Sequence, residues 1–509
     1  MEYDDIVVGA GSSGAPLAAR LSEDPDRSVL LLEAGPDYPT VAQSPDDLLH
    51  TWVSVGPHDW GLIAKARPDR EITYPRGKVT GGSSAVNGHI ALRGTPEDFD
   101  EWAAWGNPEW SFAKVLPFYR KLENDRDMQG DFHGANGPIW IERPTSETWQ
   151  PVNRAFFDAC REHGYAEVAD HNDPRSTGVG PWPRNRRDGI RISTAIGYLN
   201  PARHRANLTI RPFCNTHRVI VESGRAVGVE IECGGVVQKI RARRVTLSAG
   251  AINSPAILMR SGIGPRDELK TLGIESVTDL PGVGRNLIDH LLVPVVAIPT
   301  PGVPHDPLVM NPIGVRYTAS GSAEFNDMQM YIFNFYNKDL WQGPGLDVPW
   351  PSLAVTPGLQ RPRARGRVSL RSFDPDVPVN IDLNYLEDPE DVRRMVEGVR
   401  IAWNLMNSAP FGPYIKEFFN ITKEIVDSDS ATADFVRNNC GTIYHPTTTA
   451  KMGPKSDPEA VVDQYFRVHG VAGLRVVDAS VMPNIVRANT NLTCIMLGER
   501  AADWMRAGA

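Results

Sequence analysis

The sequence of 509 residues lacks any long uninterrupted apolar run. A membrane-spanning helix needs roughly 18 apolar residues, and no stretch approaches that length, so no membrane span is predicted. The N-terminus also lacks the basic head and apolar core of an export signal, because a short apolar stretch at residues 6–8 follows an acidic opening. From these absences we expect a cytoplasmic protein.

Positive charge is scarce as well. The 53 Lys and Arg residues are outnumbered by 62 Asp and Glu residues, which gives a formal net charge of -9. The two signs are interleaved along the chain, whereas a nucleic-acid-binding face needs clustered basic residues. We therefore expect no nucleic-acid partner.

Cysteine is the third scarce feature, with five residues and no CxxC pair. The odd number and scattered positions predict neither a disulfide framework nor a zinc site, and no metal site is expected. Free cysteines are usually small buried apolar groups, which suits a reducing cytoplasm. The five residues are Cys160, Cys214, Cys233, Cys440 and Cys494.

What the sequence does contain is a glycine-rich turn between a predicted strand and a predicted helix. Residues 5–9 form a short apolar run, Gly9-Ala-Gly11-Ser-Ser-Gly14 follows, and residues 15–21 have helical spacing. This strand–GxGxxG–helix order is the dinucleotide-binding fingerprint. The first glycine permits the tight turn, the second lets the backbone approach a pyrophosphate, and the third lets helix and strand pack closely.

An acidic residue stands where this fingerprint requires one. A second predicted strand, residues 29–32, ends at Glu33, nineteen residues after Gly14. A carboxylate there accepts hydrogen bonds from the adenosine ribose and repels a 2′-phosphate. The fingerprint predicts a bound dinucleotide but does not distinguish NAD from FAD. No second GxGxxG occurs between a strand and a helix, as a nicotinamide site for hydride exchange would require.

Three further segments resemble the motifs of the glucose-methanol-choline (GMC) oxidoreductase family, in the order and over nearly the whole length that the family shows. The first is Tyr74-Pro-Arg-Gly-Lys-Val-Thr-Gly-Gly-Ser-Ser-Ala-Val-Asn-Gly88. Its small residues let the backbone and the Ser83 hydroxyl press on the pyrophosphate, and Asn87 would lie along the flavin edge. Some relatives attach FAD covalently through a histidine at the position of Val86, so noncovalent FAD is implied.

The second segment, Val-Thr-Leu-Ser-Ala-Gly-Ala-Ile-Asn-Ser-Pro at residues 245–255, resembles a strand that turns beside the cofactor. Residues 281–290, Pro-Gly-Val-Gly-Arg-Asn-Leu-Ile-Asp-His, also fit the family at this point in the chain. Asp289 and His290 look like a catalytic pair, but the resemblance implies a structural role for both, because the family's chemistry lies elsewhere.

The third segment is C-terminal and carries the implied catalytic residues. His445-Pro-Thr-Thr-Thr-Ala-Lys-Met-Gly resembles the family's His-x-x-Gly-Thr-x-x-Met-Gly, with Thr448 where most relatives have glycine. Residues 473–483 resemble the strand that closes the flavin site, and Asn489 matches the family's second catalytic position. The resemblance implies that His445 is the general base and that Asn489 orients the hydroxyl group.

The family implies an α/β fold with a Rossmann-like FAD lobe and an α+β substrate lobe that contains an antiparallel sheet. We expect a discontinuous FAD-binding domain, with a substrate-binding domain between its parts. The expected FAD-binding parts are residues 1–150, 195–290 and 440–509, and the expected substrate-binding parts are 151–194 and 291–439. Within the middle block, residues 209–221 and 227–240 alternate like the strands of a hairpin.

The implied cofactor contacts come from all three FAD-binding parts. They are Gly9, Gly11, Ser12, Ser13, Gly14, Glu33, Ala34, Arg76, Gly77, Gly82, Ser83, Asn87, Gly88, His89, Val219, Ala249, Asp478, Ala479, Asn491 and Thr493. Tyr444, Phe333 and Phe335 are the expected substrate-facing aromatics. Tyr331 and Trp341 are assigned to neither pocket nor core, and Trp341 with Trp350 lies in a Gly/Pro-rich stretch that suits a lid.

The expected reaction is oxidation of a small-molecule alcohol to an aldehyde or ketone. Flavin N5 takes the hydride and the protein takes the hydroxyl proton. Histidine suits the base because its reference pKa of ~6.5 leaves it mostly neutral near pH 7. Two alternatives stay open, a lyase that keeps the flavin unreduced and a flavin-binding protein without activity. The sequence names neither the alcohol nor the electron acceptor, which is oxygen or another oxidant.

Overall fold

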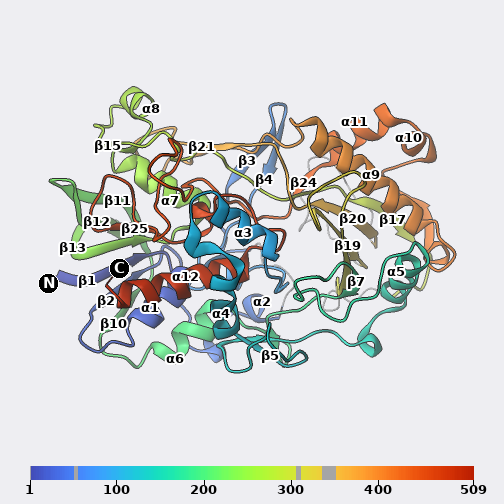
Figure 1. The fold of residues 1–509 in the computed structure, drawn as a ribbon, viewed down its shortest axis with the longest axis horizontal. Helices are drawn as coiled ribbons and strands as arrows, with labels where there is room; N and C mark the ends of the chain where they lie inside the picture. The colour runs from blue at the N-terminus through green and yellow to red at the C-terminus, as the bar shows by residue number, and fades with distance from the viewer. Residues whose placement is uncertain (1, 51–55, 305–310, 335–350, 509) are drawn as a thin grey trace.

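Two large β-sheets organise the chain, one at each end of the molecule (Figure 1). The computed structural model describes residues 2–50, 56–304, 311–334 and 351–508. Each sheet has its own hydrophobic core, so the chain buries apolar surface in two places rather than one. This division is expected for a chain too long for a single core.

The first sheet has seven strands in the order β10-β2-β1-β13-β12-β11, with β25 paired to β13. Its pairings β10–β2, β2–β1, β1–β13 and β13–β25 are parallel, and β13–β12–β11 is an antiparallel extension. The strands are β1 (Glu2–Val8), β2 (Val29–Leu32), β10 (Leu208–Arg211), β11 (Cys214–Glu222), β12 (Arg225–Cys233), β13 (Val236–Leu247) and β25 (Leu474–Val476).

The register of the parallel strands brings their carboxyl ends to one edge. Val8 pairs with Leu32 on one side and with Leu247 on the other, and Leu247 pairs with Val476. All four residues of β2 are fully buried, as expected for a parallel strand covered on both faces. The loops that follow these strands therefore meet at one edge, where open α/β sheets bind ligands.

Three helices place these loops against one another. Helix α1 (Gly14–Leu21) follows β1, α7 (Gly250–Arg260) follows β13, and α12 (Asn491–Arg506) packs on α1 from the far end of the chain (Figure 1). A Cβ atom on Gly498 would lie 2.4 Å from the Ser13 carbonyl oxygen. The absence of a side chain there lets α12 approach the glycine-rich turn.

The second sheet is antiparallel, in the order β23-β17-β20-β19-β18-β7, with β16 joining β20 to β24. Helices α5 (Pro151–Glu162) and α9 (Pro389–Met406) pack against it. Its strands are β7 (Gly178–Pro181), β16 (Leu291–Leu292), β17 (Val295–Pro299), β18 (Ile313–Tyr317), β19 (Met328–Phe333), β20 (Leu353–Leu359), β23 (Ile415–Phe418) and β24 (Gly441–Thr442).

Smaller elements connect and cover the two sheets. A four-stranded sheet joins β3 (Ile63–Arg67) and β4 (Arg70–Thr73) to β21 (Arg367–Ser369) and β22 (Asn380–Asp382). Short strand pairs are β5 (Glu123–Asp125) with β6 (Ile139–Ile141), β8 (Arg186–Arg187) with β9 (Ile190–Arg191), and β14 (Ile263–Gly264) with β15 (Thr278–Asp279). The remaining helices are α2 (Asp46–Leu49), α3 (Pro96–Ala104), α4 (Phe112–Leu122), α6 (Asn200–Ala202), α8 (Arg266–Thr271), α10 (Lys423–Asp427) and α11 (Asp429–Asn439).

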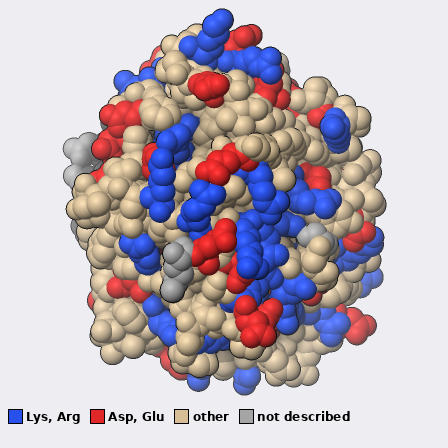
Figure 2. Space-filling model, turned by 90° about the vertical axis from the view of Figure 1, so that its left-hand side faces the viewer, with Lys and Arg blue, Asp and Glu red and all other residues tan. Residues whose placement is uncertain are grey.

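The structure confirms the predicted fold class, a Rossmann-like parallel lobe beside a lobe with an antiparallel sheet. The predicted hairpin is present as β11–β12, which extends the first sheet. Among the described helices, none is both long and apolar enough to cross a membrane. Lys and Arg gather on the end of the molecule that carries the first sheet, with Asp and Glu beside them (Figure 2), and pairs such as Arg241–Glu222 join the two signs.

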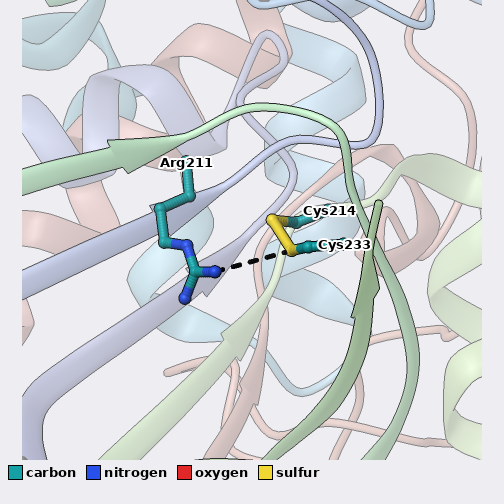
Figure 3. The surroundings of a disulfide bond; sticks show 3 residues. All are labelled: Arg211, Cys214 and Cys233. Carbon is teal, nitrogen blue, oxygen red and sulfur yellow. Dashed lines mark hydrogen bonds between the residues drawn. A yellow bond between two sulfur atoms is a disulfide. The ribbon is translucent and has the colours of Figure 1, made fainter. Parts of the chain in front are cut away.

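The prediction of five free cysteines was wrong. Cys214 of β11 and Cys233 of β12 form a disulfide, with Cα atoms 4.5 Å apart at the open end of the hairpin (Figure 3). The pairing is geometric, because the register of the two strands places these residues directly opposite each other. Cys160, Cys440 and Cys494 are free and buried as expected.

Candidate active site

A cavity opens at the edge where the parallel strands end, and it extends to the antiparallel sheet. Glu33 lines it near the first sheet, while Tyr331 of β19 lines it on the side of the second. Sixteen of the predicted cofactor residues line this cavity. They are Gly9, Gly11, Ser12, Ser13, Glu33, Ala34, Arg76, Gly77, Gly82, Ser83, Asn87, Gly88, Ala249, Asp478, Ala479 and Asn491.

Two glycine-containing segments touch backbone to backbone on the cavity wall. A Cβ atom on Gly82 would lie 2.6 Å from the Cα atom of Gly11, and Gly82 has φ +52°. Gly9 has φ +99°, and a Cβ atom there would lie 2.4 Å from the Ser248 carbonyl oxygen. Only glycine satisfies both the left-handed backbone and the close approach. The turn after β1 and the 77–88 segment therefore form one surface, open to the cavity.

Glu33 lies at the nucleotide end of the cavity. Its carboxylate accepts hydrogen bonds from the backbone N–H groups of Ala10 at 3.0 Å and Gly35 at 2.9 Å. Burial raises the pKa of Glu33 to about 7 in spite of these bonds. Since a carboxylate has about four lone-pair sites, it retains capacity for further donors such as ribose hydroxyl groups.

Other polar atoms on the cavity wall also lack protein partners. The Asn491 side-chain oxygen accepts from the Ser12 hydroxyl at 2.8 Å, whereas its amide nitrogen has no hydrogen-bond partner in the described residues. The hydroxyl groups of Thr216 and Ser248 are also buried, and neither has a hydrogen-bond partner in the part of the chain that the structure describes. Buried polar groups are normally hydrogen-bonded, so these atoms fit a polar ligand such as a dinucleotide.

Four predicted cofactor residues lie outside the cavity lining. A Cβ atom on Gly14 would lie 1.9 Å from the Gly9 carbonyl oxygen, so its role is close packing. The Val219 N–H donates to the Ser261 hydroxyl, and the Thr493 hydroxyl pairs with that of Tyr119. His89 is buried at φ +60° beside the wall. Strand β11 reaches the cavity instead through Cys214, Asn215 and Thr216.

The two predicted catalytic side chains face each other in the same cavity. The amide nitrogen of Asn489 lies 3.3 Å from Nε2 of His445. The side-chain oxygen of Asn489 has no hydrogen-bond partner in the described residues. A single hydroxyl oxygen can therefore reach both His445 Nε2 and the Asn489 amide.

His290 contacts the other side of the same imidazole. Its Nδ1 lies 2.9 Å from Nδ1 of His445, with the two rings nearly perpendicular at 89°. One nitrogen must donate and the other accept, so the pair couples the tautomers of the two rings. Sequence reasoning missed this contact, although it had singled out the segment that contains His290.

Asp289 fixes the backbone of the loop that carries His445. One carboxylate oxygen accepts from the hydroxyl groups of Tyr74 at 2.6 Å, Tyr385 at 2.7 Å and Thr442 at 2.6 Å. The other accepts from the His445 backbone N–H at 2.6 Å. Four buried donors thus converge on one carboxylate, which holds the loop in place.

The loop itself has an unusual backbone. Tyr444 and Thr448 have φ values of +66° and +74°, in the left-handed region that L-residues rarely adopt. The value at Thr448 is one that glycine adopts without strain and that a β-branched residue rarely adopts. The Arg76 guanidinium donates to the Tyr444 carbonyl at 2.8 Å and supports the turn. The loop that carries His445 therefore has a strained backbone that hydrogen bonds hold in place.

Both histidines are neutral near pH 7. Burial lowers the pKa of His290 to about 3. Burial also lowers the pKa of His445 well below its ordinary value, and the neighbouring His290 and Arg76 add to the effect. A neutral His445 has a lone pair, which is what a general base requires.

Aromatic side chains from the antiparallel sheet line the catalytic end. Phe333 and Tyr444, both predicted to face substrate, line the cavity, and so does Tyr331. The centroids of the Tyr331 and Phe333 rings are 6.2 Å apart. Phe335, Trp341 and Trp350 lie outside the described residues.

One group of side chains away from this cavity has the spacing of metal ligands, namely Glu123, Asp125 and His133. Cationic partners already neutralise it, because Arg93 pairs with Glu123 and Arg143 pairs with Asp125. Bonds from His133 to the carboxylates raise the pKa of this histidine to about 10, so it adds a third positive charge. The arrangement is an ion-pair network between β5 and its surroundings.

Comparison with known proteins identifies relatives of this chain. The N-terminal GMC oxidoreductase model matches residues 3–292, and the C-terminal GMC oxidoreductase model matches residues 362–498. A GMC-type oxidoreductase of Rhodococcus erythropolis is 38% identical, over 98% of this chain and 97% of its own length. An oxygen-dependent choline dehydrogenase of Rhizobium meliloti is 36% identical, over 99% of this chain and 95% of its own length.

Solved structures agree with these sequence matches. The structure of pyridoxine 4-oxidase from Mesorbium loti superposes with a TM-score of 0.90 at 29% identity and covers 99% of both chains. The resemblance thus extends over both sheets and the cavity between them. The chain belongs to the GMC oxidoreductase family.

Proposed function

We propose that this protein is an FAD-dependent enzyme that oxidises an alcohol to an aldehyde or ketone, with His445 as general base. The observation that carries the proposal is the pair of His445 Nε2 and the Asn489 amide nitrogen, 3.3 Å apart in the cavity that the dinucleotide fingerprint also lines. When bound, FAD supplies the hydride acceptor, its N5 atom.

His445 takes the hydroxyl proton. With its own proton on Nδ1, His445 donates to His290 Nδ1, and the proton of His290 is then on Nε2. This arrangement leaves the lone pair of His445 Nε2 directed at the cavity and at Asn489. His290 is thus a positioning residue that selects the reactive tautomer of the base.

Asn489 orients the substrate without adding charge. Its amide group has donors for the alcohol oxygen and an acceptor oxygen that no described residue occupies. Because the amide nitrogen and His445 Nε2 lie 3.3 Å apart, a hydroxyl group held by Asn489 has its proton beside the base. Proximity of this kind replaces a bimolecular encounter with a fixed geometry.

The wall residues described above would hold FAD without a covalent bond. Val86, at the position where some relatives carry a histidine, lines the cavity with a hydrocarbon side chain that offers no nucleophile. Glu33 would bind the ribose, and Ser12 and Asn491 lie at the start of α1 and α12 beside the close Gly11–Gly82 contact. The start of α1 suits a pyrophosphate because a helix N-terminus presents backbone N–H groups and a favourable dipole to an anion.

We propose a domain division that keeps the first sheet in one part and every strand of the second sheet except β24 in the other. We assign residues 1–150, 195–290 and 440–509 to the FAD-binding domain, and residues 151–194 and 291–439 to the substrate-binding domain. The pairing of β7 with β18 supports the second assignment, because it joins residue 178 to residue 316 within one sheet. The β3–β22 pairing crosses this division and ties the two parts together.

Anaerobic flavin reduction tests the proposal. His445→Ala should retain bound FAD and slow reduction by about 10²–10⁴-fold, the usual effect of removing a general base. His50→Ala, a change on the surface, is the matched control and should reduce at the wild-type rate. A yellow His445→Ala protein that is reduced as fast as the control would refute the role of His445.

The pH profile gives an independent check. The imidazolium form has no lone pair, so the wild-type rate should fall as pH drops through the pKa of His445. Because burial lowers that pKa, the decline should lie below the ordinary value of ~6.5. His445→Ala should lose this acid limb.

A further inference from the structure

We infer that the substrate is an uncharged aryl alcohol, in which a neutral aromatic ring adjoins the carbinol carbon. The inference rests on the proposed function and names the substrate class of the same site. It is carried by two observations, the apolar side chains at the catalytic end of the cavity and the lack of a free carboxylate there among the described lining residues.

Hydrocarbon side chains and rings form much of the wall at the catalytic end, with Asn311 as a polar member. Leu292, Ile443 and Tyr331 belong to one patch of this wall, because all three approach Gly358 of β20. Leu292 pairs with Gly358, while a Cβ atom on Gly358 would lie 2.8 Å from Ile443 Cδ1 and 3.4 Å from Tyr331 Cε2. All three residues line the cavity with His445.

The wall continues through Ile90 and the rings of β19. Ile90 bridges to Arg184, whose guanidinium donates to the Asn311 carbonyl at 2.7 Å. Asn311 in turn accepts from the indole of Trp182, whose ring centroid lies 5.6 Å from that of Tyr331. Ile90, Asn311 and Tyr331 all line the cavity, so this part of the wall combines apolar side chains with one amide.

No carboxylate belongs to this wall among the described residues. The two acidic residues that line the cavity are Glu33 and Asp478. Glu33 is at the nucleotide end, and Asp478 accepts from the Gly250 N–H and the Ser254 and Ser480 hydroxyl groups. Neither is free to accompany a cationic substrate.

Two charged groups lie close to the base, the Asp289 carboxylate and the Arg76 guanidinium. Asp289 already accepts four hydrogen bonds and is not among the residues that line the cavity, whereas Arg76 lines it. Arg76 donates to the Tyr444 carbonyl, and its guanidinium lies 5.9 Å from the centre of the Tyr444 ring. A quaternary ammonium alcohol bound here would therefore lose its water and meet an apolar wall without a counterion. The Tyr444 ring could not compensate for this loss, because it already faces the Arg76 guanidinium. Burying an unpaired charge is strongly unfavourable, so the geometry selects against choline-like substrates.

The ring surfaces select among the neutral alcohols. Tyr331 and Phe333 project from the same face of β19, with interplanar angle 31°. An aryl substituent can stack on such rings or meet them edge-on, which a saturated ring of the same size cannot do as well. The preference for an aromatic over a saturated ring should be about two- to tenfold.

A charge-only comparison tests the first part. Choline and 3,3-dimethyl-1-butanol have nearly the same shape and differ in one positive charge. The holoenzyme is mixed with each under anaerobic conditions, and the concentration dependence of flavin bleaching gives the dissociation constant. The neutral isostere should bind at least tenfold more tightly. Equal binding, or tighter binding of choline, overturns the inference while leaving alcohol oxidation intact.

A ring comparison tests the second part with ligands that cannot be oxidised. Benzamide should inhibit benzyl alcohol oxidation at least threefold more tightly than cyclohexanecarboxamide, and should raise the melting temperature of the holoenzyme more. Phe333→Leu should make the inhibition constants of the two amides nearly equal. Phe373→Leu, a change at an exposed ring, should keep the wild-type ratio of these two constants. Equal inhibition of the wild type by both amides overturns the aryl assignment.

The same samples separate this inference from the proposed function. If benzyl alcohol and both aliphatic alcohols fail to bleach a flavin that dithionite reduces, the proposed function itself is wrong and the inference falls with it. If an alcohol bleaches the flavin but the preferences run the other way, only the substrate class is wrong.

Discussion

Replacing His290 with leucine should disable His445 although His290 does not face the substrate. The structure places His290 Nδ1 2.9 Å from His445 Nδ1, and both rings are buried. In His290→Leu the His445 Nδ1–H loses its acceptor in an environment from which water is excluded. The neutral imidazole then shifts its proton to Nε2, which removes the lone pair from the side that faces Asn489.

The size of the effect follows from the cost of a buried donor without a partner, about 1–3 kcal/mol. At 1.4 kcal/mol per tenfold, flavin reduction should slow by roughly five- to 150-fold. His290→Asn is the matched variant, because an asparagine side-chain oxygen occupies nearly the position of histidine Nδ1 and can accept from His445. It should recover much of the rate, although both substitutions remove part of the same ring.

Stopped-flow reduction at saturating alcohol measures these rates, and the absorbance of bound FAD and a melting curve show that each variant is folded. His171→Leu controls for the loss of a buried histidine, since the pKa of His171 is also lowered to about 3 by burial but the ring contacts Trp182 rather than the base. Wild-type reduction by a yellow His290→Leu protein would refute the tautomer argument. So would an asparagine variant as slow as the leucine variant.

Two further outcomes are expected. Asn489→Ala should slow flavin reduction by very roughly ten- to a hundredfold, because a hydrogen bond to a group that develops charge is worth about 1.5–3 kcal/mol. If this variant is reduced at the wild-type rate, Asn491 becomes the candidate for orienting the hydroxyl group. Reduction of the Cys214–Cys233 disulfide should lower the melting temperature, because closing a chain of 19 residues contributes about 3 kcal/mol. A Cys214→Ser, Cys233→Ser double variant with the same melting temperature as the oxidised wild type would contradict this. Mass spectrometry before and after thiol treatment reports the redox state of the cysteines.

Most of the fold could be predicted from local patterns in the sequence. The apolar runs before Gly9 and Glu33 became β1 and β2, because a buried parallel strand needs apolar residues on both faces and a glycine turn where it meets a helix. The alternation on either side of Gly224 became the β11–β12 hairpin for a similarly local reason. These features depend on neighbours in sequence and can therefore be predicted from it.

Contacts between distant segments could not be predicted in the same way. His290 and His445 are 155 residues apart, and nothing in either segment encodes a 2.9 Å approach of their rings. The disulfide escaped because an odd cysteine count gives no pairing, whereas the register of β11 with β12 determines it at once. Val219 lies outside the cavity lining, which β11 reaches through Cys214, Asn215 and Thr216, and the strand has an irregularity between Thr216 and Arg218 that local alternation does not reveal.

The order of the strands in the first sheet has a consequence for folding during synthesis on the ribosome. Strand β1 is made first, but its neighbour β13 begins at Val236 and β25 at Leu474. The growing sheet therefore has an open edge beside β1 until β13 is made and beside β13 until β25 is made, a state that favours aggregation and chaperone binding. The loop with His445, the strand β25 and the helix α12 that covers the glycine turn all come from the final part of the chain. Cofactor loading must accordingly wait until translation is nearly complete, so overproduced protein should gain from slower synthesis more than from added flavin during its early stages.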